Sequence, residues 1–88
     1  MENQERTLKA DGFDSAIIGI YVESEPPRLI YSKQRMIEVL LSDEIELDEA
    51  IEYLEYNTWA AYVGPGTPIY IDEANHDQAL EILESIGG

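Results

Sequence analysis

From Met36 to Gly88 the chain contains no lysine or arginine, although this part carries thirteen acidic residues. The first 35 residues are nearly balanced, because six acids are accompanied there by all five cations of the chain: Arg6, Lys9, Arg28, Lys33 and Arg35. The acids after Met36 repel one another more in a compact fold than in an open chain, so they constrain any structure that the chain adopts. The formal net charge of −14 also repels nucleic-acid phosphates and anionic lipids. The sequence therefore predicts no direct binding to nucleic acids or membranes, and it favours cationic proteins as partners.

The length and composition indicate one small globular domain. The chain has 88 residues, of which 44% are hydrophobic and 27% are charged. Cysteine is absent, which excludes disulfide bonds, thiolate zinc sites and cysteine nucleophiles. No apolar run approaches the roughly 18 residues that a membrane span needs, and the polar N-terminal stretch lacks the apolar core of a signal peptide. We therefore expect a cytoplasmic protein, with residues 1–12 as a flexible arm and 13–88 as a single acidic α/β domain.

Three segments of the sequence are predicted to be strands. The run from Ala16 to Val22 is continuously apolar and rich in β-branched residues, which predicts a strand that is central in its sheet and buried on both faces. Residues 24–28 include two prolines and predict a turn, after which Leu29–Tyr31 returns as the second strand of a hairpin. A third strand is predicted for residues 68–71, after the turn at 64–68, where Pro65 and Gly66 suit the central positions of a type II turn.

Three helices are predicted from apolar spacing and capping residues. Ser32 can cap the first helix, whose apolar face is Met36, Ile37, Leu40 and Leu41. The second helix extends from Leu47 to Tyr62. The last begins at Asn75, with Gln78 three residues later as in a capping box, and ends at Gly87 and Gly88. We expect it to bury Ala79, Leu80, Leu83 and Ile86. These elements predict an α+β fold of two layers, in which a roughly three-stranded, mainly antiparallel sheet is packed with helices in the order β-β-α-α-β-α.

No catalytic or metal-binding constellation is recognisable in the sequence. The one histidine, His76, lies at the start of the last helix, where an exposed first-turn residue is the simpler interpretation. The acids around residues 43–49 and 72–77 do not match the loop of a calcium-binding EF-hand. We therefore expect a protein that is not an enzyme and has no cofactor and no specific metal site.

The segment from Asp43 to Tyr62 is the best candidate for a functional surface. Seven acids fall within residues 43–55, and four aromatic residues follow at three-residue steps: Tyr53, Tyr56, Trp59 and Tyr62. One interpretation places the aromatic side chains in the core and the acids in solvent. The other is a face that binds a protein partner, with aromatic anchors surrounded by carboxylates. The candidate interaction residues are Asp43, Glu44, Glu46, Asp48, Glu49, Glu52, Glu55, Tyr56 and Trp59.

Three segments resemble a group of small phage and prophage proteins that have no assigned activity. They are Phe13–Gly19 (FDSAIIG), Glu49–Asn57 (EAIEYLEYN) and the turn-strand around Gly66–Tyr70 (GTPIY). The resemblance covers about residues 13–72 and leaves the last helix outside it. It implies a cytoplasmic accessory protein of viral origin, and it carries over no catalytic or binding residue.

Two hypotheses about function follow. The first is a non-enzymatic acidic accessory protein of phage type that binds and inhibits or modulates a basic, nucleic-acid-binding host or defence protein, with mimicry of nucleic acid as one route. The alternative is a self-assembling homo-oligomeric module that binds a small ligand or serves a structural role. In that case the strand around Ile69–Ile71 or Leu29–Tyr31 would pair with another copy at a sheet edge.

Overall fold

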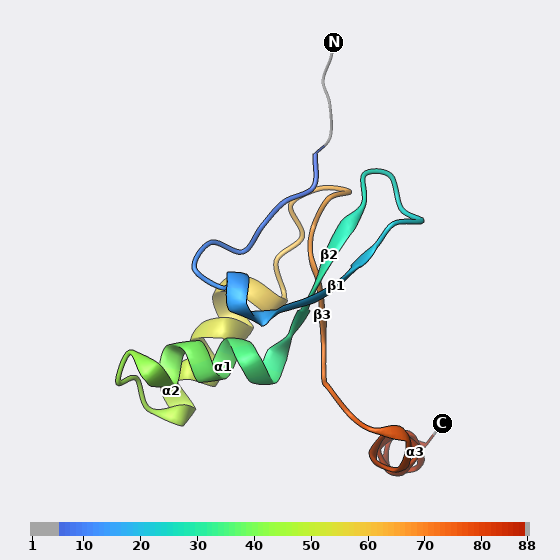
Figure 1. The fold of residues 1–88 in the computed structure, drawn as a ribbon. Helices are drawn as coiled ribbons and strands as arrows, with labels where there is room; N and C mark the ends of the chain where they lie inside the picture. The colour runs from blue at the N-terminus through green and yellow to red at the C-terminus, as the bar shows by residue number, and fades with distance from the viewer. Residues whose placement is uncertain (1–5, 88) are drawn as a thin grey trace.

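A computed structural model describes residues 6–87, and it confirms the predicted α+β fold and the element order (Figure 1). Residues 1–5 of the predicted arm, and Gly88, lie outside the described residues. The strands and helices are η1 (Asp14–Ala16), β1 (Ile17–Tyr21), β2 (Arg28–Ser32), α1 (Lys33–Ser42), α2 (Leu47–Leu54), η2 (Glu55–Trp59), β3 (Ile69–Ile71) and α3 (His76–Ser85).

The three strands form one mixed sheet in the order β1-β2-β3. β1 and β2 form an antiparallel hairpin, whereas β3 lies parallel to β2 on its other side. The prediction that the run from Ala16 to Val22 is a central strand buried on both faces is therefore wrong. β1 is an edge strand, and Ile20 and Val22 are 51% and 65% exposed. β1 is at the edge because the chain passes through α1 and α2 and then places β3 on the other side of β2. The topology of the chain, and not the apolarity of the strand, therefore determines its position in the sheet.

The central strand β2 runs directly into α1, as the capping signal at Ser32 predicts. The Ser32 side chain accepts a hydrogen bond from the backbone N–H of Arg35 at 3.2 Å. From α1, Met36 and Leu40 enter the core, whereas Leu41 is 40% exposed. The core is completed by residues of the other elements, and all of its buried apolar members are Phe13, Ala16, Tyr31, Met36, Leu40, Ala50 and Leu54.

The second helix is shorter than predicted and changes its winding. α2 ends at Leu54, and the chain continues as the π-helical turn η2, which ends at Trp59 and not at Tyr62. A π-turn holds more residues than an α-turn and so rotates the side chains that follow it. Here Trp59 lies against the core, with its indole Nε1 3.5 Å from Met36 Sδ.

The turn after η2 is present, but it is not of type II. The backbone N–H of Thr67 donates to the Gly64 carbonyl at 3.1 Å, so Pro65 and Gly66 are its central residues. A type II turn needs a positive φ at the second central position, whereas the positive φ of this turn, 123°, belongs to Gly64. Gly66 is required for another reason, because a Cβ atom there would collide with the Arg6 carbonyl.

The described part of the predicted arm is held against this turn. The Leu8 N–H donates to the Gly66 carbonyl at 3.2 Å, and the Thr7 hydroxyl donates to the Pro27 carbonyl at 2.6 Å. The Ala10 N–H donates to the hydroxyl of buried Tyr31 at 2.8 Å. These three bonds attach residues 7–10 to the sheet and to the loops at its end.

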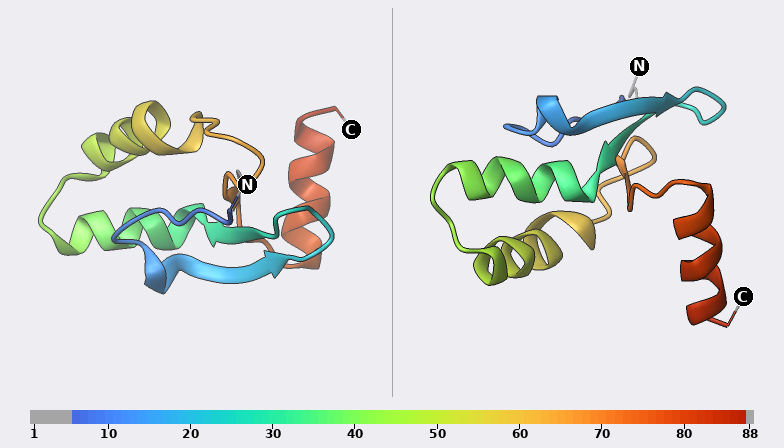
Figure 2. Two further views of the ribbon diagram at one scale, coloured as in Figure 1. Left: turned by 90° about the horizontal axis from the view of Figure 1, so that it is seen from above. Right: turned by 60° about the horizontal axis from the view of Figure 1, so that its bottom comes forward.

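The last helix has the predicted capping box but not the predicted burial. Asn75 and Gln78 exchange two hydrogen bonds of 2.9 and 3.0 Å, and Gly87 ends the helix with a φ of 80°. However, every residue of α3 is exposed, and so are all four residues that the apolar spacing predicts to be buried, Ala79, Leu80, Leu83 and the C-cap Ile86. α3 makes no extensive contact with another helix or strand of the described chain, and it stands apart from α1 and α2 in both views of Figure 2. The amphipathic pattern is present, but no surface within residues 6–87 covers the apolar side of the helix.

Candidate functional site

Three of the seven candidate acids lie in the connection between α1 and α2. Asp43 caps the C-terminus of α1, Glu44 adopts a φ of 67°, and Glu46 precedes α2 without a side-chain capping bond. All three are exposed. They lie at one end of the helical layer and extend the acidic surface beyond α2.

The other four candidate acids lie on α2 and at the start of η2. Asp48 and Glu49 occupy the first turn of α2, where the positive end of the helix dipole stabilises negative charge. Glu52 and Glu55 follow at three-residue steps, and all four side chains are exposed. Within residues 6–87 the ion pairs are Lys9–Asp14 and Arg35–Glu73, so neither involves these carboxylates. Their negative charge is therefore available to a partner.

Two tyrosines lie among these acids at the surface. Tyr53 is 51% exposed and Tyr56 is 82% exposed. Glu49, Glu52 and Tyr53 are spaced as i, i+3 and i+4 and so lie on one stripe of α2, and Tyr56 follows them on η2. Together with Ile45 and Asn57 they line a shallow hollow of about 730 Å³. A large aromatic side chain that is this exposed has little role in stability, and it is well placed for contact with another molecule.

Trp59 does not belong to this surface. It is half-buried, contacts Met36, and carries the Lys33 ammonium 4.8 Å above its ring. Its position indicates a role in packing α1 against η2. Tyr62, in contrast, is 72% exposed but lies beyond the end of η2.

We define the acidic–aromatic face as Asp48, Glu49, Glu52, Tyr53, Glu55 and Tyr56. Glu49, Glu52, Tyr53 and Tyr56 line one hollow, and Asp48 and Glu55 are exposed on the same two elements, α2 and η2. Tyr53 was not among the candidate residues chosen from the sequence, although its spacing of four residues from Glu49 and three from Tyr56 would have placed it on the same stripe. This face offers carboxylate groups as hydrogen-bond acceptors and the phenol rings of two tyrosines.

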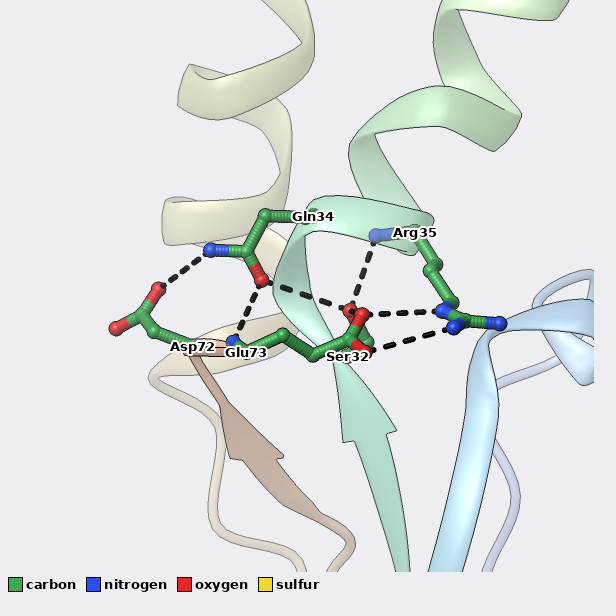
Figure 3. A network of polar contacts seen from close by, with 5 residues as sticks. All are labelled: Ser32, Gln34, Arg35, Asp72 and Glu73. Carbon is green, nitrogen blue, oxygen red and sulfur yellow. Dashed lines mark hydrogen bonds and ion pairs between the residues drawn. The ribbon is translucent and has the colours of Figure 1, made fainter. Parts of the chain in front are cut away.

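A separate polar network joins the end of β3 to the start of α1 (Figure 3). The Ser32 hydroxyl donates to Glu73 Oε1 at 2.6 Å, and Arg35 Nε donates to the same oxygen at 3.0 Å. The side-chain oxygen of Gln34 accepts from the Glu73 N–H at 2.9 Å, and its amide nitrogen donates to Asp72 at 3.4 Å. The Ser32 hydrogen bond, followed by Arg35, lowers the pKa of Glu73 below that of an ordinary glutamate. The network contains no histidine, so Ser32 has no base of the kind that activates a nucleophilic serine.

The remaining side chains of chemical interest stay apart. His76 is exposed in the first turn of α3, as its position in the sequence indicates. Among residues 6–87 no three His, Asp or Glu side chains converge as ligands of a metal ion would. None of the helices in that range has the length and apolarity to cross a bilayer.

No family model matches this sequence, and neither the curated proteins nor the solved structures that were searched contain a match.

Proposed function

We propose that this chain is a non-enzymatic interaction protein whose acidic–aromatic face binds a cationic segment of a nucleic-acid-binding protein. The observation that carries the proposal is the position of Tyr53 and Tyr56, exposed beside Glu49 and Glu52 in one hollow. Aromatic anchors surrounded by charge are typical of protein interfaces in which arginine or lysine side chains of the partner stack on rings and pair with carboxylates. The resemblance to phage proteins favours a host or defence protein as the partner, which this chain would inhibit or modulate.

The spacing of the acids supports a coarse form of nucleic-acid mimicry. Glu49, Glu52 and Glu55 succeed one another at three-residue steps, which is about 4.5 Å of helix axis per step. Phosphates along one DNA strand are about 3.4 Å apart along the axis. A basic groove that accepts one strand of phosphates could therefore accept this row of carboxylates, with the tyrosine rings in the place of bases.

Binding of this kind depends on charge, so its test is capture at two salt concentrations with two matched variants. The tagged protein is immobilised and exposed to a bacterial lysate at low and at high salt. The first variant carries Glu49→Lys, Glu52→Lys and Glu55→Lys on the acidic–aromatic face. The control variant carries Asp77→Lys, Glu81→Lys and Glu84→Lys on α3 and so has the same net charge. A third variant, Tyr53→Ala with Tyr56→Ala, tests the aromatic anchors.

We expect basic nucleic-acid-binding proteins to be captured by the wild type and by the α3 control at low salt, and to be lost at high salt. The triple variant of the acidic–aromatic face should lose them, and the tyrosine variant should retain less. Equal capture by both charge-reversal variants would refute a specific role of this face. Capture that is indifferent to salt would refute the electrostatic basis of the proposal.

The alternative, self-assembly through a sheet edge, has its own supporting observation. β3 lies at an edge of the sheet, so the Ile69–Ile71 strand has one side without a neighbouring strand in the described chain. The strand has only three residues, however, and so offers few backbone hydrogen bonds to another copy.

A further inference from the structure

α3 presents an apolar face that nothing in the described chain covers. Leu80, Leu83 and Ile86 recur at three-residue steps and are 49%, 48% and 75% exposed, and Ile82 beside them is 49% exposed. The acids of the helix, Asp77, Glu81 and Glu84, lie on its opposite side. A helix with this pattern normally buries its apolar side, because leaving several aliphatic side chains in water forfeits most of the free energy of their burial.

The position of α3 is set by the network at the end of β3. Ser32, Gln34 and Arg35 hold Asp72 and Glu73, and only Ala74 and Asn75 separate this anchor from the first residue of α3 (Figure 3). The helix consequently begins just beyond the sheet and projects from the body of the molecule (Figure 2). The radius of gyration is 14.7 Å, whereas a compact chain of this length has about 12 Å.

The sheet has a second apolar surface on the side away from the core, where Ile30 and Ile69 are half-buried. Strand pairing places Gly19, Ile30 and Ile69 side by side on the face opposite to Tyr31, which is the residue that enters the core. The same face continues to Tyr21, which is 46% exposed, and to Ile71, which is 38% exposed. We name it the outer sheet face and define it as Gly19, Tyr21, Arg28, Ile30, Ile69 and Ile71. Ser32 follows Ile30 on this side of β2, but it is fully buried and its hydroxyl bonds Glu73. Neither Ile30 nor Ile69 packs against the core cluster.

Charge indicates which surface of another copy can accept α3. The helix carries three acids and no cation, and it belongs to the part of the chain after Met36, in which every charged side chain is acidic. Contact between α3 and the α1–α2 side of another copy would bring like charges together. The outer sheet face includes Arg28, whose Nε donates to the Thr67 carbonyl, and four of its six residues belong to the N-terminal part, which holds all of the cations. The acid at its end, Glu73, is paired with Arg35. The outer sheet face is thus the apolar surface that repels α3 least.

We infer that α3 of one copy docks on the outer sheet face of a second copy, and reciprocally, in a two-fold dimer. Reciprocal docking covers both apolar surfaces of each chain. Neither an α3 helix nor an outer sheet face is then free to bind a third copy, so the assembly closes at two copies. The inference does not rest on the proposed function, because the acidic–aromatic face belongs to α2 and η2 and takes no part in the contact.

The first experiment is sedimentation equilibrium of the full chain over a wide concentration range, at low and at high salt. We expect the mass of a dimer, and we expect it to persist at high salt because the contact is apolar. The variant Leu80→Gln, Leu83→Gln, Ile86→Gln should sediment as a monomer over the same range with an unchanged melting transition, since α3 does not support the rest of the fold. A wild type that is monomeric at every concentration would overturn the inference. A wild type that forms the dimer but captures no basic protein at low salt would refute the proposed function alone.

The second experiment locates the contact and uses the absence of native cysteine. Two single variants, Leu83→Cys and Ile69→Cys, are mixed and treated with a short bis-maleimide. We expect the mixture to give a cross-linked pair that contains one chain of each variant. The double variant Leu83→Cys with Ile69→Cys tests the other arrangement, in which α3 folds onto the sheet of its own chain. A cross-link within that single chain, together with no link between the mixed single variants, would overturn the dimer. Leu83→Cys mixed with Glu55→Cys serves as the control and should not link.

Discussion

The hydroxyl of Ser32 donates a 2.6 Å hydrogen bond to Glu73 Oε1 across 41 residues of sequence. The same oxygen of Ser32 accepts the N–H of Arg35 and thereby caps α1. One fully buried hydroxyl thus holds both the start of α1 and the segment that follows the neighbouring strand β3. Because α3 follows Glu73 after two residues, this bond also determines where the exposed helix begins.

Ser32→Ala should raise the pKa of Glu73 toward the value of an ordinary glutamate. In the wild type the pKa of Glu73 is lowered, first by the Ser32 hydrogen bond and then by Arg35. A carboxyl group with a lowered pKa stabilises the fold above its unfolded pKa, and this contribution is lost as the pH falls through the folded pKa. The variant should therefore lose less stability than the wild type on acidification through that window.

Carboxyl resonances followed by NMR through an acid titration measure this shift directly. Arg35→Gln is the matched comparison and should also raise the pKa of Glu73, because it removes a hydrogen bond and a positive charge. Removal of the cap lowers the stability of α1 at every pH, so it cannot imitate a change in the titration of Glu73. Identical titration of Glu73 in the wild type and in Ser32→Ala would contradict the role of this bond.

Tyr31→Phe should destabilise the fold by about 1–3 kcal/mol. The Tyr31 ring is fully buried, and its hydroxyl is the acceptor for the Ala10 N–H at 2.8 Å. Removal of the acceptor leaves a partly buried donor without a partner, which costs about that much. Urea unfolding measures the change. Tyr70→Phe is the control, since among residues 6–87 the Tyr70 hydroxyl makes no hydrogen bond, and it should change the stability by less than about 0.5 kcal/mol.

Gly66→Ala should displace the N-terminal segment from the turn at residues 64–67. The added methyl group would meet the carbonyl of Arg6 and approach Pro26 Cγ at 3.3 Å. The backbone bond from Leu8 to the Gly66 carbonyl should then break. Hydrogen exchange at the Leu8 amide measures this, and we expect it to accelerate in the variant. Gly12→Ala has no neighbour to collide with and should leave the Leu8 amide unchanged, although its φ of 90° introduces local strain.

Leu54→Ala should destabilise the fold much more than Tyr56→Ala, because the two side chains lie on opposite sides of the helical layer. Leu54 is fully buried, so its truncation should cost about 2–5 kcal/mol through lost burial and the cavity left behind. Tyr56 is 82% exposed, so its truncation should change the stability by less than about 0.5 kcal/mol. Thermal unfolding of both variants checks this. Comparable destabilisation by the two variants would mean that Tyr56 supports the core and is not available to a partner.

Local signals were sufficient to predict most element boundaries. The cap at Ser32, the capping box of Asn75 and Gln78, and the stop at Gly87 depend on neighbours within a few residues, and the structure contains all three. The same holds for the exposure of the acids on α2, because a carboxylate has to remain hydrated wherever the helix packs. The binding role of that surface stays a proposal.

Tertiary structure alone decided the position of each element relative to the others. The apolar run at β1 predicts a central strand. Strand order, however, depends on where the chain returns after α1 and α2, and a local sequence pattern does not determine that position. The apolar face of α3 predicts a helix that packs on the core. Periodicity indicates only that such a face is favourably buried, and not which surface buries it. The sequence predicts Trp59 as an anchor on the binding surface, but in the structure Trp59 lies in the π-helical turn and contacts Met36. The sequence by itself determined the elements, their caps and the acidic surface, because these follow from interactions between near neighbours. The strand order, the projection of α3 and the partners of Ser32 and Gly66 arise from contacts between distant segments, and only the folded chain brings those segments together.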